Sequence, residues 1–225
     1  MLPQSLAFVK ALQSDYDGDE DDDDDNESGT CLYSVSMTID GHLICGLSGR
    51  VGIWDTNDGK LQHSTDVAGH MLDMKQYGDH LYGACLHDGQ LTVVRYDRQL
   101  NNREEIVSIP YQANKLAQID VRYGNIAVVN YDKKLINLYT IDGEFTRDIM
   151  LRDRQHPYGV RLLMDGCILV YDCDTGSVTK YRIDGSGSVV WKCAQLQRAS
   201  GLDVDEWGII YVCGKSAILL LSLNG

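Results

Sequence analysis

Acidic residues beside glycines are the side chains that come closest to a metal-binding pattern in this sequence. Asp172 and Asp174 lie with Gly176 in the loop D-C-D-T-G, and carboxylate oxygens in such loops bind calcium. Two carboxylates without a third acid nearby make a poor oxygen cage, so we interpret them as turn formers. The sequence has no G-x-S-x-G, H-E-x-x-H or Walker motif. Its six His are scattered, and His42 and His80 lie just after turn glycines. We therefore expect no catalytic residue, no metal and no cofactor.

The seven cysteines do not form a recognisable metal or disulfide pattern. Their number is odd and no C-x-x-C pair occurs, so the spacing predicts no zinc site. Several lie among apolar residues, as in L-I-C-G and Y-V-C-G. We interpret them as small buried side chains that stay reduced.

The net charge of −13 comes mostly from one segment. Ten of the 33 acidic residues lie within residues 1–30, against one of the 20 basic residues, so the other 195 residues carry a net charge of −4. A nearly neutral domain lacks the basic surface typical of a strong nucleic-acid binder. Residues 14–30 are almost continuously acidic, which predicts a disordered leader. Residues 2–13 before it have the apolar spacing of one short helix.

The first residues also argue against secretion and membrane insertion. They have no basic region before the apolar run, which stops at Lys10, unlike a signal peptide. The longest apolar stretch, around Ala217–Leu221, is far too short to cross a bilayer. We expect a soluble cytoplasmic protein without a membrane partner.

From Cys31 onward, short apolar runs alternate with Gly, Asp and Asn turns, which is typical of β-strands. Glycines that precede equivalent strands recur at steps of 37, 46, 42 and 42: Gly41, Gly78, Gly124, Gly166 and Gly208. A second set of turn glycines has steps of 84, 42 and 40: Gly59, Gly143, Gly185 and Gly225. Two independent landmarks therefore keep a period near 40 residues.

This period with several short strands per unit indicates the blades of a β-propeller. One four-stranded sheet cannot bury both of its faces, whereas stacked blades bury one another's faces. The predicted fold is all-β, with four to five stacked four-stranded antiparallel blades in an incomplete ring. A domain over 31–225 follows the leader over 1–30, and its units are 31–70, 71–114, 115–157, 158–200 and a partial 201–225.

Two propeller families resemble parts of the chain. S-G-L-D-V-D-E-W-G-I-I-Y-V-C-G-K-S-A-I-L-L-L-S-L-N-G, from Ser200 to Gly225, resembles an NHL repeat, as does the stretch from Pro157 to Val170. The segment from Ser48 to Lys60, S-G-R-V-G-I-W-D-T-N-D-G-K, is similar to a WD repeat. The motifs are degenerate, and no RING or B-box cysteine set accompanies them. The NHL resemblance implies a propeller of the kind found in tripartite-motif ubiquitin ligases, which chooses substrates or binds RNA.

The predicted function is protein binding without catalysis, with substrate recognition for a ubiquitin ligase as its narrower form. We place the candidate interaction face on the loops that join blades and middle strands, because Arg and Tyr are favoured at binding hot spots. Its residues are Tyr131, Lys133, Lys134, Arg152, Arg154, His156 and Arg198.

Two alternatives stay open. The same basic face could bind RNA phosphates. The chain could also be a metal-dependent propeller hydrolase, with Asp40, Asp120 and Asp203 on the innermost strands as ligands. We interpret these aspartates as turn caps, and we expect a protein partner.

Overall fold

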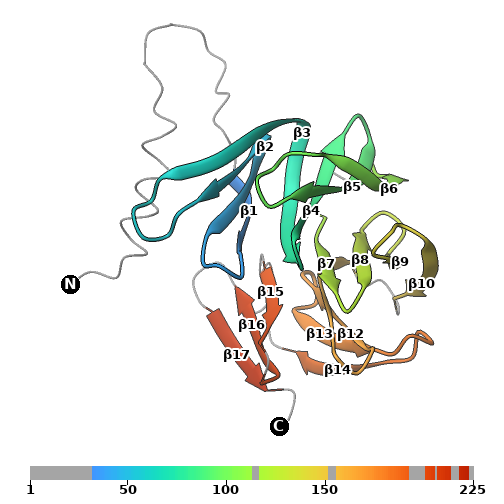
Figure 1. The fold of residues 1–225 in the computed structure, drawn as a ribbon. Helices are drawn as coiled ribbons and strands as arrows, with labels where there is room; N and C mark the ends of the chain where they lie inside the picture. The colour runs from blue at the N-terminus through green and yellow to red at the C-terminus, as the bar shows by residue number, and fades with distance from the viewer. Residues whose placement is uncertain are drawn as a thin grey trace, which may run out of the picture. The chain divides into compact units, whose positions relative to one another are not determined.

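The computed structural model describes residues 32–112, 117–151, 156–192, 201–205, 207–213 and 218–222. All regular structure within these ranges is β-strand, seventeen strands in all (Figure 1). No helix in the described ranges is long and apolar enough to cross a membrane. The predicted helix over 2–13 and the acidic leader lie outside the described residues, as do Arg152, Arg154 and Arg198.

The chain divides into two compact units. Unit 1 comprises residues 1–88 and 94–105, and unit 2 comprises residues 89–93 and 106–225. Strands β5 and β6 each contribute residues to both units, because the division falls within them. Each unit is built from antiparallel strands that follow one another in sequence order.

The first sheet has six strands in the order β1 to β6. Their bounds are Leu32–Met37, Leu43–Trp54, Leu61–Tyr77, His80–His87, Gln90–Asp97 and Glu104–Pro110. The core of unit 1 is a cluster of buried apolar side chains from β2 to β5 that includes Ile44, Val51, Met71 and Val94.

Strand β3 spans the boundary between the first two predicted repeats, 31–70 and 71–114. Its first part pairs with β2, ending at Ser48 opposite His70, and its second part pairs with β4, beginning at His70 opposite Leu86. Gly69 lies at this change of partner with a φ of +84°, a conformation that costs glycine little and other residues more. The first two predicted repeats therefore share one continuous strand.

Unit 2 contains three successive meander sheets. Strands β7 to β10 span Ile119–Arg122, Asn125–Asn130, Leu135–Thr140 and Phe145–Met150. Strands β11 to β14 span Pro157–Leu162, Ile168–Asp172, Ser177–Tyr181 and Gly187–Lys192. Strands β15 to β17 span Gly201–Val204, Ile209–Cys213 and Ile218–Ser222. These sheets have four, four and three strands among the described residues.

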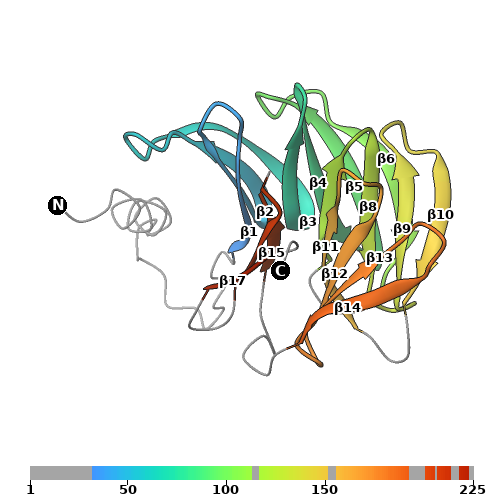
Figure 2. The ribbon, with the colours of Figure 1, turned by 90° about the horizontal axis from the view of Figure 1, so that it is seen from below.

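The three sheets of unit 2 stack face to face, and the middle one is buried on both sides (Figure 2). In β12, Ile168 and Val170 pack with residues of β8 and β9, while Leu169 and Tyr171 pack with residues of β15 and β16. Alternate side chains of a strand point to opposite faces of its sheet, so β12 is apolar at nearly every position. This stacking of antiparallel meanders confirms the predicted all-β propeller architecture.

Candidate functional site

The predicted interaction face is partly described. The β8–β9 loop carries Tyr131, Lys133 and Lys134, and His156 lies just before β11. The rings of Tyr131 and His156 are stacked with centroids 5.2 Å apart. His156 also forms an ion-pair contact with Asp174 through Nδ1. The structure therefore brings two of the predicted residues together, and the role of the face in binding stays a prediction.

The D-C-D-T-G loop organises its own backbone. The Asp172 carboxylate accepts hydrogen bonds from the main-chain N–H groups of His156, Asp174 and Thr175, at 3.1, 2.9 and 2.9 Å. Such side-chain acceptors are typical of Asx turns. Across the described ranges, no three His, Cys, Asp or Glu side chains gather in a way that could hold a metal ion.

A charged network joins the first strands of the three sheets of unit 2. The Arg161 Nε of β11 lies 2.9 Å from Asp203 Oδ1 of β15, and Arg122 Nη2 of β7 lies 3.1 Å from the same oxygen. Asp120 of β7 accepts a 2.7 Å hydrogen bond from the Leu162 main-chain N–H and lies 3.4 Å from Arg122. Two of the aspartates considered as metal ligands are thus neutralised by guanidinium groups.

The network is buried at its centre and open at one end. The side chains of Asp120 and Arg161 are 1% and 7% exposed, whereas that of Asp203 is 60% exposed. Partial removal from water raises the pKa of Asp203, but the charge and hydrogen bond of Arg161, together with the Val204 N–H, bring it below its ordinary value. Asp203 is therefore a carboxylate throughout the neutral range.

The lowered pKa of Asp203 predicts an acid-dependent contribution to stability. The unfolded chain binds a proton at this carboxyl more readily than the folded chain does, so the stabilisation is present above the ordinary pKa of 3.8 and lost as pH falls below it. We expect Asp203→Asn to lower the free energy of urea unfolding at pH 7. The difference from wild type should shrink progressively below about pH 4. An equal difference at pH 7 and pH 3 would show that the charge of Asp203 is not what stabilises the fold.

The turns that follow β7, β11 and β15, at the end of the sheets away from the β8–β9 loop, present exposed apolar side chains. Each turn carries one such side chain just before its glycine. These side chains are Tyr123 in the β7–β8 turn, Met164 in the β11–β12 turn and Trp207 in the β15–β16 turn. Their exposed fractions are 50%, 83% and 72%. We call these three residues and their turns the turn face. In unit 1, the equivalent turns carry the exposed Ile39 and Tyr77.

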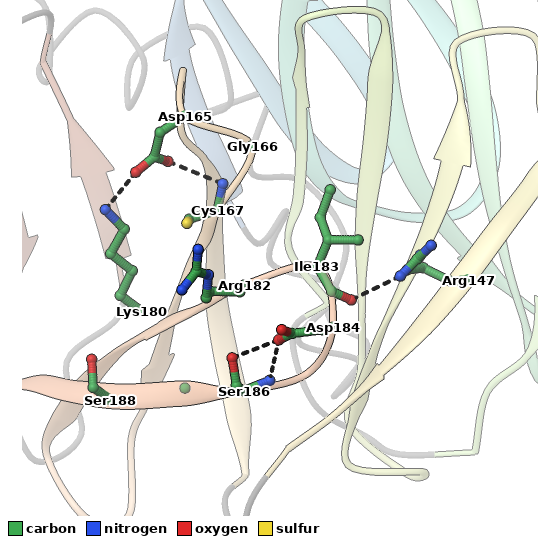
Figure 3. A pocket seen from close by; sticks show the side chains of 11 residues that line it. Arg147, Asp165, Gly166, Cys167, Lys180, Arg182, Ile183, Asp184, Ser186 and Ser188 are labelled. Carbon is green, nitrogen blue, oxygen red and sulfur yellow. Dashed lines mark hydrogen bonds and ion pairs between the residues drawn. The ribbon is translucent and has the colours of Figure 1, made fainter.

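A groove of about 840 Å³ lies beside the turn face, between β10 and the two hairpins of the next sheet (Figure 3). Its lining side chains include three cations, two carboxylates and two hydroxyls: Arg147, Lys180, Arg182, Asp165, Asp184, Ser186 and Ser188. Lys180 Nζ donates to Asp165 at 2.6 Å, and Arg147 Nη1 donates to the Ile183 carbonyl at 3.0 Å. The groove is therefore polar and mixed in charge, and its described lining residues carry an excess of one positive charge.

An apolar crevice of about 170 Å³ adjoins the groove. Its walls include Leu138, Leu162, Leu163 and Ile168, with Tyr123 and Met164 of the turn face also on its lining. Arg147, Gly166 and Ile183 line both the crevice and the groove. The two hollows are consequently neighbours that share a wall.

Comparison with known proteins identifies the fold. The sequence matches no family model and no curated protein. Among solved structures, it is similar to virginiamycin B lyase from Staphylococcus aureus, with a TM-score of 0.68 and 12% identity over 88% of this chain and 69% of the lyase. It is similar to a chain of a nidogen/laminin complex, with a TM-score of 0.67 and 12% identity over 87% of this chain and 77% of that one.

A third similar structure is the Swd1 β-propeller domain of Myceliophteria thermophila. Its TM-score is 0.57 and its identity 13%, over 85% of this chain and 82% of the domain. The chain spans about two thirds of the length of the streptogramin-type lyase structures. At such low identities the likeness shows the β-propeller fold alone, and neither the NHL nor the WD subtype is established.

The lyase similarity corrects one prediction. We expected the chain not to be an enzyme, because a propeller offers rims for docking instead of a pocket for reactions. That inference is wrong, because propellers of this shape include lyases. The fold is compatible with catalysis and with binding, so the function has to be argued from particular residues.

Sequence reasoning missed the turn face and its hollows. The glycine register already aligns Tyr77, Tyr123 and Trp207, each directly before a turn glycine. An aromatic residue repeated before a turn glycine, where polar residues are usual, was a signal in the repeats of this sequence that could have indicated the turn face. Lys180 and Arg182 come from a strand and a turn that lie far along the chain from Arg147, so their proximity needed the fold.

Proposed function

We propose that the protein binds other proteins through the turn face. The observation that carries this proposal is that three successive sheets each expose a large apolar side chain at the equivalent turn: Tyr123, Met164 and Trp207. Scattered exposed apolar residues are ordinary, but a set gathered on one face marks an interaction site. Tyr and Trp are also the residues most enriched at binding hot spots.

The turn face is held by a rigid support. Arg122, next to Tyr123, bonds to Asp203 of β15, and Arg161 of β11 bonds to the same carboxylate. These links fix the relative positions of β7, β11 and β15 at the base of the turns. A preorganised surface loses little conformational entropy on binding, so these side chains suit recognition of a folded or extended partner.

Two further points favour a protein partner. A chain of similar fold occurs in a nidogen/laminin complex. The NHL-like motifs favour the narrower proposal that the partner is a substrate chosen for a ubiquitin ligase.

A triple variant tests the proposal. We expect Tyr123→Ser, Met164→Ser and Trp207→Ser together to reduce capture of specific partners at least tenfold, since one hot-spot side chain contributes about 2 kcal/mol or more. All three side chains are exposed, so the fold should be retained. Tagged wild-type and variant proteins would be compared by quantitative mass spectrometry of captured proteins, followed by calorimetric titration of each purified partner.

The matched control changes the predicted face at the other end of the strands. Lys133→Ser with Lys134→Asn removes two charges there, and Asn tolerates the left-handed φ of 55° at position 134. The lysine variant should still capture the same partner proteins as wild type. Loss of partners in the lysine variant with retention in the triple variant would move the binding site to the predicted face, and recovery of RNA in the captures would favour the RNA alternative.

A further inference from the structure

The groove and the apolar crevice adjoin each other, and we call the two together the composite site. Both are lined by Arg147, Gly166 and Ile183, so a segment leaving one hollow enters the other. Met164 and Tyr123 connect the crevice to the turn face. This inference rests on the proposed function and names the chemistry that the partner would present there.

The crevice has the size and character of a pocket for one apolar side chain. Its volume of about 170 Å³ resembles that of an engineered cavity of about 150 Å³ that binds benzene. The apolar part of its lining is mostly aliphatic, with Leu138, Leu162, Leu163 and Ile168, and Asn125 and Thr146 add polar groups. A leucine or phenylalanine side chain would fill the crevice and would thereby be removed from water.

The groove, by contrast, suits a carboxylate. Both of its own acids are already used: Asp165 accepts from Lys180 and from the Cys167 N–H, and Asp184 accepts from the N–H and hydroxyl of Ser186. The hydrogen bond from Lys180 lowers the pKa of Asp165, and that from Ser186 lowers the pKa of Asp184. Both therefore stay ionised and occupied.

The arginines of the groove, by contrast, keep hydrogen-bond donors that no described residue of the groove uses. No described side chain or carbonyl accepts a hydrogen bond from the exposed Arg182 guanidinium, which lies between Lys180 and Asp184 (Figure 3). Arg147 commits one terminal nitrogen to the Ile183 carbonyl, and a guanidinium has five N–H donors in all. A planar guanidinium with spare donors matches the two oxygens of a carboxylate.

We infer that the composite site binds an extended segment of a partner protein in which a leucine or phenylalanine is followed closely by an aspartate or glutamate. The apolar side chain enters the crevice and the carboxylate pairs with Arg182, with Arg147 at the junction of the two hollows. The positive excess among the described lining residues of the groove favours an acidic residue in the bound segment.

Selection from a phage library of random short peptides tests this inference. Peptides would be selected on the full chain and then synthesised with a fluorescent label for anisotropy titrations. We expect enrichment of a leucine or phenylalanine with a nearby acidic residue. Arg182→Glu should weaken binding of these peptides about tenfold, and replacing their acid by lysine should restore binding to that variant.

The control is Arg50→Glu, which reverses an exposed arginine in unit 1 and should leave affinity unchanged. Arg147→Glu is a second variant of the groove and should weaken binding of the same peptides. The inference is overturned if enriched peptides lack an acidic residue, if Arg182→Glu leaves their affinity unchanged, if no peptide is enriched, or if single-stranded RNA binds the groove in preference to the peptides. Partner capture that depends on Trp207 but not on Arg182 would overturn this inference alone and leave the proposed function standing.

Discussion

Replacement of Arg161 by alanine is expected to lower the free energy of unfolding by about 3 kcal/mol. The Arg161 side chain is 7% exposed and faces Asp203 at 2.9 Å and Asp120 at 3.9 Å. Its removal leaves the buried Asp120 carboxylate with less compensating positive charge, which is costly in a medium of low dielectric constant. Urea unfolding followed by circular dichroism measures the change.

A matched substitution separates burial from the mere loss of an arginine. Arg50→Ala removes the same group from an exposed ion pair with Asp66, where the distance is 3.3 Å. Exposed pairs contribute at most about 1 kcal/mol, so this variant should unfold close to wild type. Equal losses for Arg161→Ala and Arg50→Ala would refute the idea that the network across β7, β11 and β15 holds these sheets together.

Gly69→Ala is expected to destabilise unit 1 by about 3 kcal/mol or more. The left-handed φ of 84° at Gly69 costs an alanine about 1–2 kcal/mol. An added Cβ would also lie 2.1 Å from the Leu86 carbonyl oxygen and 2.9 Å from the His87 Cβ. The oxygen belongs to the backbone of β4, so relief of the clash requires the β3–β4 pairing to shift.

Gly41→Ala isolates the conformational part of this cost. Gly41 has nearly the same φ, 86°, but an added Cβ there would meet nothing within 4 Å. We expect a loss of only about 1–2 kcal/mol. Urea unfolding of both variants, with intrinsic tryptophan fluorescence as the signal, gives the comparison. If the two glycine variants proved equally stable, close packing at the middle of β3 could not be the cause.

The repeating glycines predicted the architecture because their positions are set locally. Gly124, Gly166 and Gly208 each have φ between 73° and 79° in a turn between the first two strands of a sheet, and few other residues adopt such angles readily. The apolar runs between them then become strands by alternation. Local rules of this kind were enough to obtain the all-β fold and the stacked sheets.

The boundary between the first two repeats was beyond such rules. Residues Leu61 to Tyr77 contain a mixture of polar and apolar residues with Gly69 in the middle, which on local grounds indicates a turn. In the structure Gly69 instead lies inside a continuous strand that exchanges partners from β2 to β4. Pairing with strands on either side decides this, and no single segment carries that information.

The site was predictable only in part for the same reason. Asp40, Asp120 and Asp203 were placed on the innermost strands and interpreted as turn caps. The pairing of Asp120 and Asp203 with Arg161 was not predicted, because it depends on strands that lie far apart in the sequence. Tyr131 and His156 were expected on one face, and the structure stacks them. The crevice between two sheets has no counterpart in the sequence, because it arises from the packing of one sheet on the next.

The shared strand β3 also limits how the chain can be engineered. In most repeat proteins a unit can be excised or duplicated, because each repeat contacts only its neighbours across an interface. Here a cut at His70 would sever the one strand that pairs with β2 in its first part and with β4 in its second part. The first two repeats should therefore be transferred to another protein together, and they should unfold together. A junction for shortening or circular permutation has to lie outside β3.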